Sequence, residues 1–307
     1  MVDRGGRQAR IDREGNALRI VAALDGTAAD EAVIDWAADQ AARDGASLHL
    51  LHVLDTGMQF TPHEMLLGEA PGVATSLEEA ARVIVERGRG RCTDRQPSVV
   101  VSVAVEWGSP ADVLVSHARD ARLLVVGSRP RGRVERAVVG SVALACVHHG
   151  SAPVVVVPMA VRVSAPRHVV VAVDGSPPSH RAADLALSIA SGSGAEVRCV
   201  VGWSVEVVDG TVVTEPGTHA WTTVEHRYAG VAQRSLDVAR SRNPEVDVTI
   251  DVRHAEPSRA VLEAADEVDA DLVVLGSRGF GGFRGLLLGS VAKRVLERAT
   301  TVVAIVK

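Results

Sequence analysis

The amino-acid sequence repeats itself at one fixed offset. Asp25-Gly26-Thr27 recurs 149 positions later as Asp174-Gly175-Ser176, and Gly140-Ser141-Val142 recurs at the same offset as Gly289-Ser290-Val291. Solenoid units are roughly 20–50 residues long, so a period of this length indicates two duplicated domains. Each half therefore serves as an internal comparison for the other.

The length and composition suit two α/β domains. The chain has 307 residues, of which 47% are hydrophobic but only 3% aromatic. The cores must therefore consist of Val, Ala, Leu and Ile, as in a parallel sheet covered by helices. The formal net charge of −5 provides no field that attracts nucleic acid. We expect a flexible tail at residues 1–16, domains at 17–158 and 167–307, and a linker at 159–166.

Targeting signals are not apparent in the sequence. The first 16 residues are polar and charged and lack the apolar core of a signal peptide. The apolar runs elsewhere are about as long as strands, so no membrane span is expected. Cys92, Cys146 and Cys199 form no CxxC motif, which favours structural thiols in a reducing cytoplasm over a disulfide framework.

Apolar runs of strand length alternate with helical periodicity in both halves. Strands are expected at Leu18–Leu24, Ser47–Leu54, Ser98–Glu106, Leu123–Val126, Pro153–Val157, His168–Val173, Glu196–Val201, Val246–Val252, Asp271–Leu275 and Val302–Val306. Helices are expected between them, while residues 55–76 and 203–218 are interpreted as irregular. This order predicts right-handed βαβ crossovers and a five-stranded parallel sheet in each half.

The most informative motif follows the fourth strand of the second half. It reads Gly-Ser-Arg-Gly-Phe-Gly-Gly-Phe-Arg-Gly-Leu-Leu-Leu-Gly-Ser from Gly276 to Ser290 and leads into a helix. Glycine lets backbone N–H groups approach an anion closely, and a helix N-terminus with a hydroxyl suits phosphate. Ligands of such sheets bind at the carboxyl ends of the strands, where Asp174 also lies. The alternative is a mobile surface loop, with Ser290 and Asp174 acting as helix caps.

These features resemble the universal stress protein family in its tandem-domain form, over nearly the whole chain beyond residue 16. Its ATP-binding branch carries Gly, two residues, Gly, nine residues, Gly, then Ser or Thr. Gly276, Gly279, Gly289 and Ser290 match that pattern completely. The resemblance implies two tandem Rossmann-like domains, of the adenine nucleotide alpha hydrolase-like type. It also implies that ATP, with or without Mg²⁺, binds with its triphosphate and ribose on the glycine loop.

The resemblance also assigns residues of the second half to the nucleotide. In this family the carboxylate that ends the first strand lies near adenine and ribose, and the end of the second strand contacts adenine through its backbone. Transferred to this sequence, the predicted nucleotide-binding residues are Ala172, Asp174, Gly202, Gly276, Ser277, Arg278, Gly279, Gly281, Gly282, Gly289, Ser290 and Val291.

The first half departs from the pattern, because Pro130 replaces the second glycine. Proline lacks an N–H and fixes φ near −65°, so a loop that needs that donor holds phosphate more weakly. Nearby arginines either compensate by direct contact with phosphate or form a solvated basic face; they are Arg129, Arg131, Arg133 and Arg136. The weaker site predicted for this half comprises Ala23, Asp25, Val53, Gly127, Ser128, Arg129, Arg131, Gly132, Gly140, Ser141 and Val142.

The motifs of several enzyme classes are missing from the sequence. It has no P-loop, no GxGxxG at its first helix, no GxSxG nucleophile elbow and no HExxH. No catalytic residue and no protein metal site is predicted. The leading hypothesis is an ATP-binding regulator that acts through nucleotide-dependent conformation and partner contacts. The alternatives are slow ATP hydrolysis or phosphotransfer, for example to Ser277 or Ser290, and a scaffold or chaperone-like protein that works without nucleotide.

The last strand of each half is expected to mediate assembly. Pro153–Val157 and Val302–Val306 are apolar and β-branched, and such a strand left at a sheet edge invites pairing. In the family this strand often forms dimers. We therefore expect the two halves to pair within the chain and two chains to form a homodimer, while no residue identifies a protein partner.

Overall fold

The computed structural model describes residues 18–57, 70–130, 137–161, 165–208, 210–280 and 288–307. The chain divides into two compact units, Met1–Ser164 (unit 1) and Ala165–Lys307 (unit 2). Each unit is a five-stranded parallel sheet flanked by helices, so the predicted α/β fold is confirmed in both halves.

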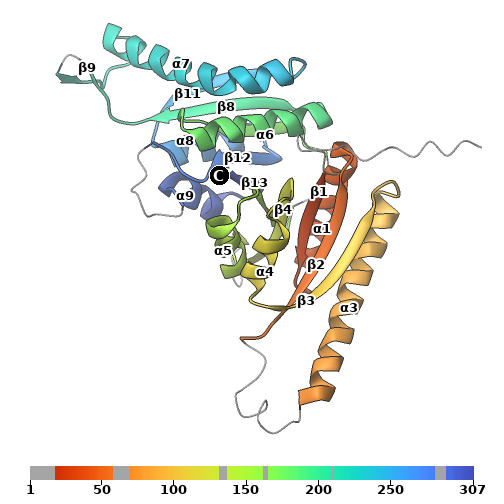
Figure 1. The fold of residues 1–307 in the computed structure, drawn as a ribbon. Coiled ribbons are helices and arrows are strands. Elements are labelled where there is room, and N and C mark those ends of the chain that lie inside the picture. Colours follow the sequence, from red (N-terminus) through yellow and green to blue (C-terminus); the bar gives the residue numbers. More distant parts are fainter. Residues whose placement is uncertain (1–17, 58–69, 131–136, 162–164, 209, 281–287) are drawn as a thin grey trace, which may run out of the picture. The chain divides into compact units, whose positions relative to one another are not determined.

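Unit 1 contains a parallel sheet in the order β6-β4-β1-β2-β3. Its strands are β1 (Arg19–Leu24), β2 (Ser47–Asp55), β3 (Val101–Gly108), β4 (Leu123–Pro130) and β6 (Val154–Pro158). Its helices are α1 (Ala29–Asp44), α3 (Ala70–Arg95), α4 (Pro110–His117) and α5 (Ser141–His149). Helices α1 and α3 pack together on one face of the sheet, and α4 and α5 pack together on the other (Figure 1).

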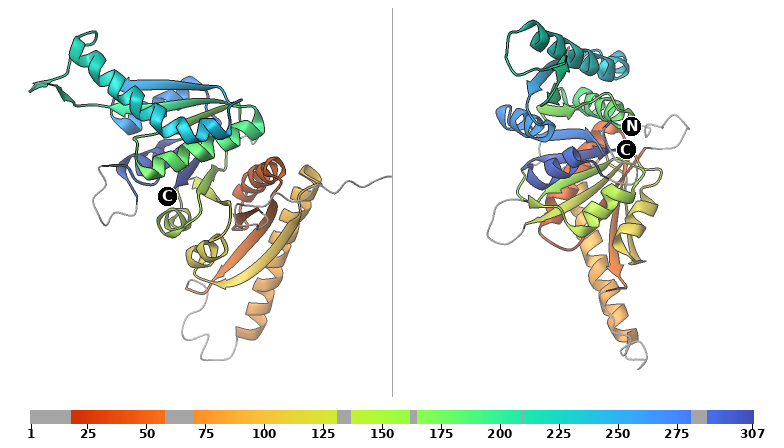
Figure 2. Two further views of the ribbon diagram at one scale, coloured as in Figure 1. Left: turned by 45° about the horizontal axis from the view of Figure 1, so that its top comes forward. Right: turned by 90° about the vertical axis from the view of Figure 1, so that its left-hand side faces the viewer.

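Unit 2 has the corresponding order, β13-β12-β7-β8-β11, again all parallel. Its strands are β7 (His168–Ala172), β8 (Glu196–Trp203), β11 (Val248–His254), β12 (Leu272–Gly276) and β13 (Val302–Val306). Its helices are α6 (Pro177–Ser193), α7 (His219–Arg242), α8 (Pro257–Glu267) and α9 (Ser290–Arg298). Figure 2 shows α6 and α7 side by side, and α8 packs with α9.

The strand order creates a switch point in each unit. With the strands numbered within the unit, both sheets run 3-2-1-4-5, so the connections diverge between the first and the fourth strand. Ligands of open α/β sheets bind outside the carboxyl ends of the strands at this point. In unit 1 these ends are Leu24 of β1 and Pro130 of β4, and in unit 2 they are Ala172 of β7 and Gly276 of β12.

The strands of both sheets form an aliphatic core, as the composition predicts. Ile20, Val21 and Ala22 of β1 are fully buried, and so are Val169, Val170 and Val171 of β7. Near-continuous apolar strands of this kind are typical of parallel sheets covered on both faces. The three cysteines are free and buried, and no described helix is long and apolar enough to cross a membrane.

The structure corrects the sequence-based assignments at three places. Helix α3 begins at Ala70 rather than Leu77, because Pro71 falls in its first turn, where the missing N–H costs no hydrogen bond. Strand β4 continues past Val126 to Pro130, where it pairs antiparallel with the short strand β5 (Ala137–Val138). The segment interpreted as irregular after Trp203 contains a hairpin of β9 (Val207–Val208) and β10 (Thr211–Val212).

Candidate functional site

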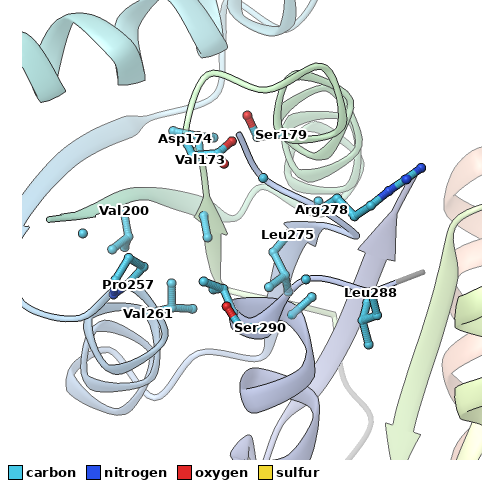
Figure 3. A pocket seen from close by; sticks show the side chains of 17 residues that line it. Val173, Asp174, Ser179, Val200, Pro257, Val261, Leu275, Arg278, Leu288 and Ser290 are labelled. Atoms are coloured by element: carbon cyan, nitrogen blue, oxygen red, sulfur yellow. The ribbon is translucent and has the colours of Figure 1, made fainter. Parts of the chain in front are cut away.

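A cavity of about 470 Å³ opens at the switch point of unit 2 (Figure 3). Nine of the predicted nucleotide-binding residues line it: Ala172, Asp174, Gly202, Gly276, Arg278, Gly279, Gly289, Ser290 and Val291. Ser277 is buried and is not part of the lining, while Gly281 and Gly282 lie outside the described residues. The structure therefore brings together segments that are more than a hundred positions apart in the chain.

Asp174 joins the turn after β7 to the glycine loop after β12. Its Oδ1 accepts a hydrogen bond from the backbone N–H of Ser176 (3.0 Å), and its Oδ2 accepts one from the N–H of Phe280 (3.0 Å). The N-cap of α6 is Ser176, whose side chain accepts from the N–H of Ser179, so the interpretation of Asp174 as the helix cap was wrong. Asp174 instead fixes the loop against the first-strand turn.

Two glycines allow close approach at the base of the loop. A Cβ built on Gly279 would lie 2.1 Å from Asp174 Oδ2, and one built on Gly276 would lie 2.9 Å from the Cβ of Pro178. The loop is also held at Ser277, whose N–H donates to the carbonyl of Val306 and whose carbonyl accepts from the N–H of Gly289. A side chain at position 279 thus displaces the Asp174 carboxylate from the loop.

Helix α9 presents uncapped N–H groups to this cavity. Its N-cap is Gly289, which has no side chain to accept from the first turn, and the first intrahelical bond there runs from Lys293 N–H to the Gly289 carbonyl. The first-turn residues Ser290, Val291 and Ala292 all line the cavity. Free N–H groups and the helix dipole make this end of α9 a site suited to an anion.

Positive charge gathers near the glycine loop of unit 2. Arg278 lines the cavity, and in Figure 3 its side chain points away from Val200 and Val261. Burial lowers the pKa of Lys307, and the nearby Arg278 charge lowers it further. These two cations therefore raise the local potential beside the end of the cavity that the loop forms.

Several lining residues were missed by sequence reasoning. They are Ser179 of α6, Val200 of β8, Pro257 and Val261 of α8, and also Val173, Leu275, Leu288 and Ala292. Figure 3 shows Pro257 and Val261 on one side of the cavity and Ser179 on another. These side chains carry no motif. Pro257 and Val261 reach the cavity because α8 packs over β8 and β7.

Unit 1 has a cavity of about 490 Å³ at the equivalent place. Of the residues predicted for the weaker site, those that line it are Ala23, Asp25, Val53, Gly127, Ser128, Gly140, Ser141 and Val142. Arg131, Gly132, Arg133 and Arg136 lie outside the described residues, as does the side chain of Arg129. Helix α5 repeats the uncapped N-terminus of α9, with Gly140 as its N-cap.

The two units differ most in the segment after the fourth strand. In unit 1, Arg129 and Pro130 continue β4 and pair with Val138 and Ala137 of β5. Asp25 accepts from the N–H and the hydroxyl of Thr27 within its own turn. In unit 2, by contrast, β12 ends at Gly276 and Phe280 bonds to Asp174. The repeated motif therefore forms a β-ribbon in one unit and a turn over the carboxylate in the other.

The charge of the unit 1 cavity also differs. Asp30 and Asp55 line it besides Asp25, and His52 contributes an imidazole. Burial raises the pKa of Asp30 to about 6, although its carboxylate accepts from the N–H groups of Asp25 and Gly26. Burial lowers the pKa of His52, so the ring is neutral near pH 7.

Neither cavity contains a built metal site in the part of the chain that the structure describes. Within that part, no group of three or more His, Cys, Asp or Glu side chains is arranged to hold a metal ion. A divalent cation at either cavity would need ligands from a bound molecule or from water.

Comparison with known proteins places this fold and repeat in one family. Residues 17–158 and 166–307 each match the model of the universal stress protein family. A universal stress protein of Mycolicibacterium smegmatis is 32% identical over 296 residues, covering 94% of this chain and 96% of that protein. One of Mycobacterium tuberculosis is 31% identical with the same coverage.

A solved structure that covers both units agrees on the fold. A universal stress protein of Archaeoglobus fulgidus has a TM-score of 0.69 at 18% identity, covering 94% of this chain and 98% of its own. A shorter universal stress protein, solved in complex with cAMP, is 31% identical, with a TM-score of 0.33, and covers 47% of this chain and 98% of its own. The two family matches and the full-length relatives establish that this chain belongs to the universal stress protein family, as a member with two tandem domains.

Proposed function

We propose that unit 2 binds ATP and that the protein is a stress-response regulator acting through nucleotide-dependent conformation and partner contacts. The observation that carries this proposal is the uncapped N-terminus of α9, which lines the same cavity as Asp174 and Gly279. Free N–H groups there suit phosphate, and a cavity of about 470 Å³ has the size of small-molecule sites. The complete glycine pattern of this half supports ATP as the ligand.

The described residues divide naturally between the two parts of a nucleotide. The N–H groups of Ser290 and Val291 and the Ser290 hydroxyl would hold phosphate, with the positive charge of Arg278 nearby. Asp174 and the backbone of Ala172 and Gly202 would lie beside the adenosine part. Ser277, Gly281 and Gly282 remain predicted members of the phosphate loop. Mg²⁺, where present, would arrive on the phosphates.

The bond between Asp174 and Phe280 suggests how occupancy reaches the surface. It connects two segments 106 positions apart, and Phe280 exposes 76% of its surface. ATP bound between these segments would stabilise one arrangement of both, and with it one orientation of an exposed aromatic ring. A ligand shifts a conformational equilibrium only through such a difference in contacts. Partner binding through this loop would then depend on nucleotide.

The test is a calorimetric titration of the full-length chain with ATP, in the presence and in the absence of MgCl₂. Gly279→Glu places a charged side chain against the Asp174 carboxylate and in the space proposed for phosphate. We therefore expect the affinity of unit 2 for ATP to fall at least a hundredfold. Gly230→Glu is the matched control, because Gly230 lies in α7 with only the flexible Arg234 side chain nearby. Unchanged ATP binding by Gly279→Glu would refute the assigned site.

Assembly and location are the remaining proposals. We infer that two chains form a homodimer, the assembly that the family resemblance leads us to expect. Light scattering over a range of concentrations tests this, and a monomer at all of them refutes it. The cytoplasmic location stays a prediction, and fractionation of the source cells tests it.

A further inference from the structure

A cluster of rings fills the space between β8 and α7 in unit 2. The Trp203 ring lies 4.8 Å from that of Trp221 and 6.2 Å from that of Tyr228, measured between ring centroids, and the His254 ring lies 4.3 Å away. Trp203 is 2% exposed and directly follows Gly202, which lines the unit 2 cavity. Helix α7 is described throughout, and none of its residues is part of that lining. This aromatic cluster therefore separates the unit 2 cavity from α7.

The equivalent strand position in unit 1 carries a smaller side chain. Leu54 pairs with Trp107 across β2 and β3, just as Trp203 pairs with His254 across β8 and β11. Leu54 therefore stands where unit 2 has the central ring of its aromatic cluster. It lines the unit 1 cavity, whereas Trp203 is not part of the lining in unit 2.

The helix over this space also carries smaller side chains in unit 1. Helices α3 and α7 end at Arg95 and Arg242, and at the same offset Ala81 stands where unit 2 has Tyr228. The cavities have similar volumes, about 490 Å³ and about 470 Å³, but that of unit 1 reaches its covering helix. Its lining there is apolar and consists of Leu77, Ala80, Ala81 and Ile84.

Contacts on both sides of this apolar end hold α3 in place. Trp107 Nε1 donates a hydrogen bond to the carboxylate of Glu78 at 2.8 Å, which ties the helix to β3. Further along the helix, a Cβ built on Gly88 would lie 3.0 Å from the Leu24 side chain and 3.1 Å from that of Leu50, so α3 packs closely on the sheet. The fold therefore fixes the width of the space between Leu54 and α3.

The other end of the unit 1 cavity keeps groups that suit phosphate. Gly140 and Ser141 line it, and Gly140 is an N-cap without a side chain to accept from the first turn of α5. Ser128 is 2% exposed and lines the same cavity, and its Oγ has no hydrogen-bond partner among the residues that the structure describes. Free N–H groups bind phosphate, and a buried hydroxyl gains free energy from a ligand that pairs with it. The cavity thus has a polar end at α5 and an apolar end at α3.

The position of the base follows from these two ends. Ala23 and Val53 stand at the repeat positions of the proposed adenine contacts and line the cavity, and Leu54 comes next in β2. In adenine the exocyclic amine lies at the edge of the base remote from the ribose. With its phosphates at α5, an adenine nucleotide would therefore direct this amine toward α3.

We propose that the unit 1 cavity binds purine nucleotides that carry an apolar group on the exocyclic amine of the base, a class that the aromatic cluster of unit 2 excludes. The inference rests on the proposed function for the orientation of the nucleotide. The apolar group is buried between Leu54 and the alanines of α3, and its removal from water stabilises the complex. The two units then respond to different members of one ligand class.

Calorimetric titration of the full-length chain with ATP and with N6-benzyl-ATP tests this, in the presence of MgCl₂. In the Gly279→Glu background, which disables the proposed site of unit 2, N6-benzyl-ATP should bind at least about tenfold more tightly than ATP, because the benzyl group is buried. Ala80→Trp fills the apolar end from an exposed position of α3 and should abolish this preference. Val83→Trp is its control, since Val83 is 56% exposed on the same helix and is not part of the lining.

Three results would overturn the inference. Equal affinity of the Gly279→Glu chain for the two nucleotides would mean that the apolar end does not receive the benzyl group. A preference that survives Ala80→Trp would place the benzyl group elsewhere. Binding of neither nucleotide would leave unit 1 without this ligand class. The proposed function fails by a different result, equal binding of ATP by the wild-type and Gly279→Glu chains, and the effect of Ala80→Trp on the preference can still be measured in that case.

Discussion

The turns after β7 and β1 have nearly the same sequence, and each aspartate accepts from the N–H two positions later, that of Ser176 or Thr27. The units diverge after the fourth strand. In unit 2 that strand ends at Gly276, and the N–H of Phe280 donates to Asp174, whereas in unit 1 it runs on to Pro130 and pairs with β5. The sequence differences between the two repeated loops, Pro130 against Gly279 among them, thus accompany a new strand pairing and a different described lining of the cavity.

The strongest test of this comparison converts one loop into the other. Gly279→Pro gives unit 2 the residue of unit 1, removes an N–H and places carbon atoms on Asp174 Oδ2. We expect ATP affinity to fall at least a hundredfold, about 3 kcal/mol, while circular dichroism stays unchanged. Equilibrium dialysis with labelled ATP measures it. If affinity is retained, the proline at this position does not explain the difference between the units.

The second test compares how the helices over each sheet are held together. In unit 1, Asp39 of α1 accepts two hydrogen bonds from Arg95 and one from Gln96, all at 2.8 Å. In unit 2, the pair Arg242–Asp184 is partly exposed. Asp39→Ala should lower the free energy of unfolding by about 2 kcal/mol, and Asp184→Ala by less than about 1 kcal/mol. Urea unfolding of each variant measures both, and equal losses would contradict the expectation.

The stabilisation that Asp39 contributes should depend on pH. Burial acts to raise the pKa of Asp39, but the hydrogen bonds from Arg95 and Gln96 outweigh it and hold the pKa below its ordinary value. Its contribution to stability is therefore present above the ordinary carboxyl pKa and is lost as pH falls through the folded-state pKa. The difference between the wild-type chain and Asp39→Ala should shrink below about pH 4.

A third test removes the aspartate of each turn. Asp174→Ala releases both the Ser176 and the Phe280 N–H groups, so we expect ATP binding to weaken about tenfold, or about 1.4 kcal/mol. Asp25→Ala changes a turn in the other unit and should leave ATP affinity within a factor of about two. Calorimetric titration of both variants with ATP measures the two affinities. Equal losses of ATP affinity would show that ATP occupies the two cavities alike.

The smallest expected effect is a pH dependence confined to unit 1. Asp30 has a pKa raised to about 6, mainly by burial, whereas Ser179 stands at the repeat position in unit 2. A raised carboxyl pKa destabilises the folded state at neutral pH; this cost begins to fall as the pH drops through about 6 and is gone only below the ordinary carboxyl pKa. Relative to Asp30→Asn, the wild-type chain should therefore gain about 1 kcal/mol between pH 7.5 and 5. Thermal melts at both pH values check this, and a gap that stays constant would contradict it.

The sheets were predictable from the sequence because their strands are buried on both faces. Runs such as Val169–Val171 are continuous, and turn residues separate them from the helices. The glycine loop and Asp174 were predictable as neighbours, since the carboxyl ends of parallel strands meet at one edge. The two-residue strands β5 and β9 were not, because two residues show no periodicity.

The residues that helices contribute to the two cavities could not be predicted, because their places depend on where each helix crosses the sheet. Ile84 of α3 lines one cavity and Val261 of α8 lines the other, yet each resembles any other apolar residue of an amphipathic helix. The role of Asp30 was missed for a related reason. A carboxylate in a first helical turn usually has a capping role, and only the folded chain shows its burial at a cavity.

The three buried thiols limit the chemistry through which oxidants act on this protein. Burial raises the pKa of Cys92 to about 11 and those of Cys146 and Cys199 to about 12. Peroxide and disulfide reagents react with the thiolate, which is scarce at these pKa values. The folded chain is therefore insensitive to oxidants through its cysteines. Under the proposed function, an oxidative signal would reach the chain through the concentration of its nucleotide rather than through cysteine chemistry.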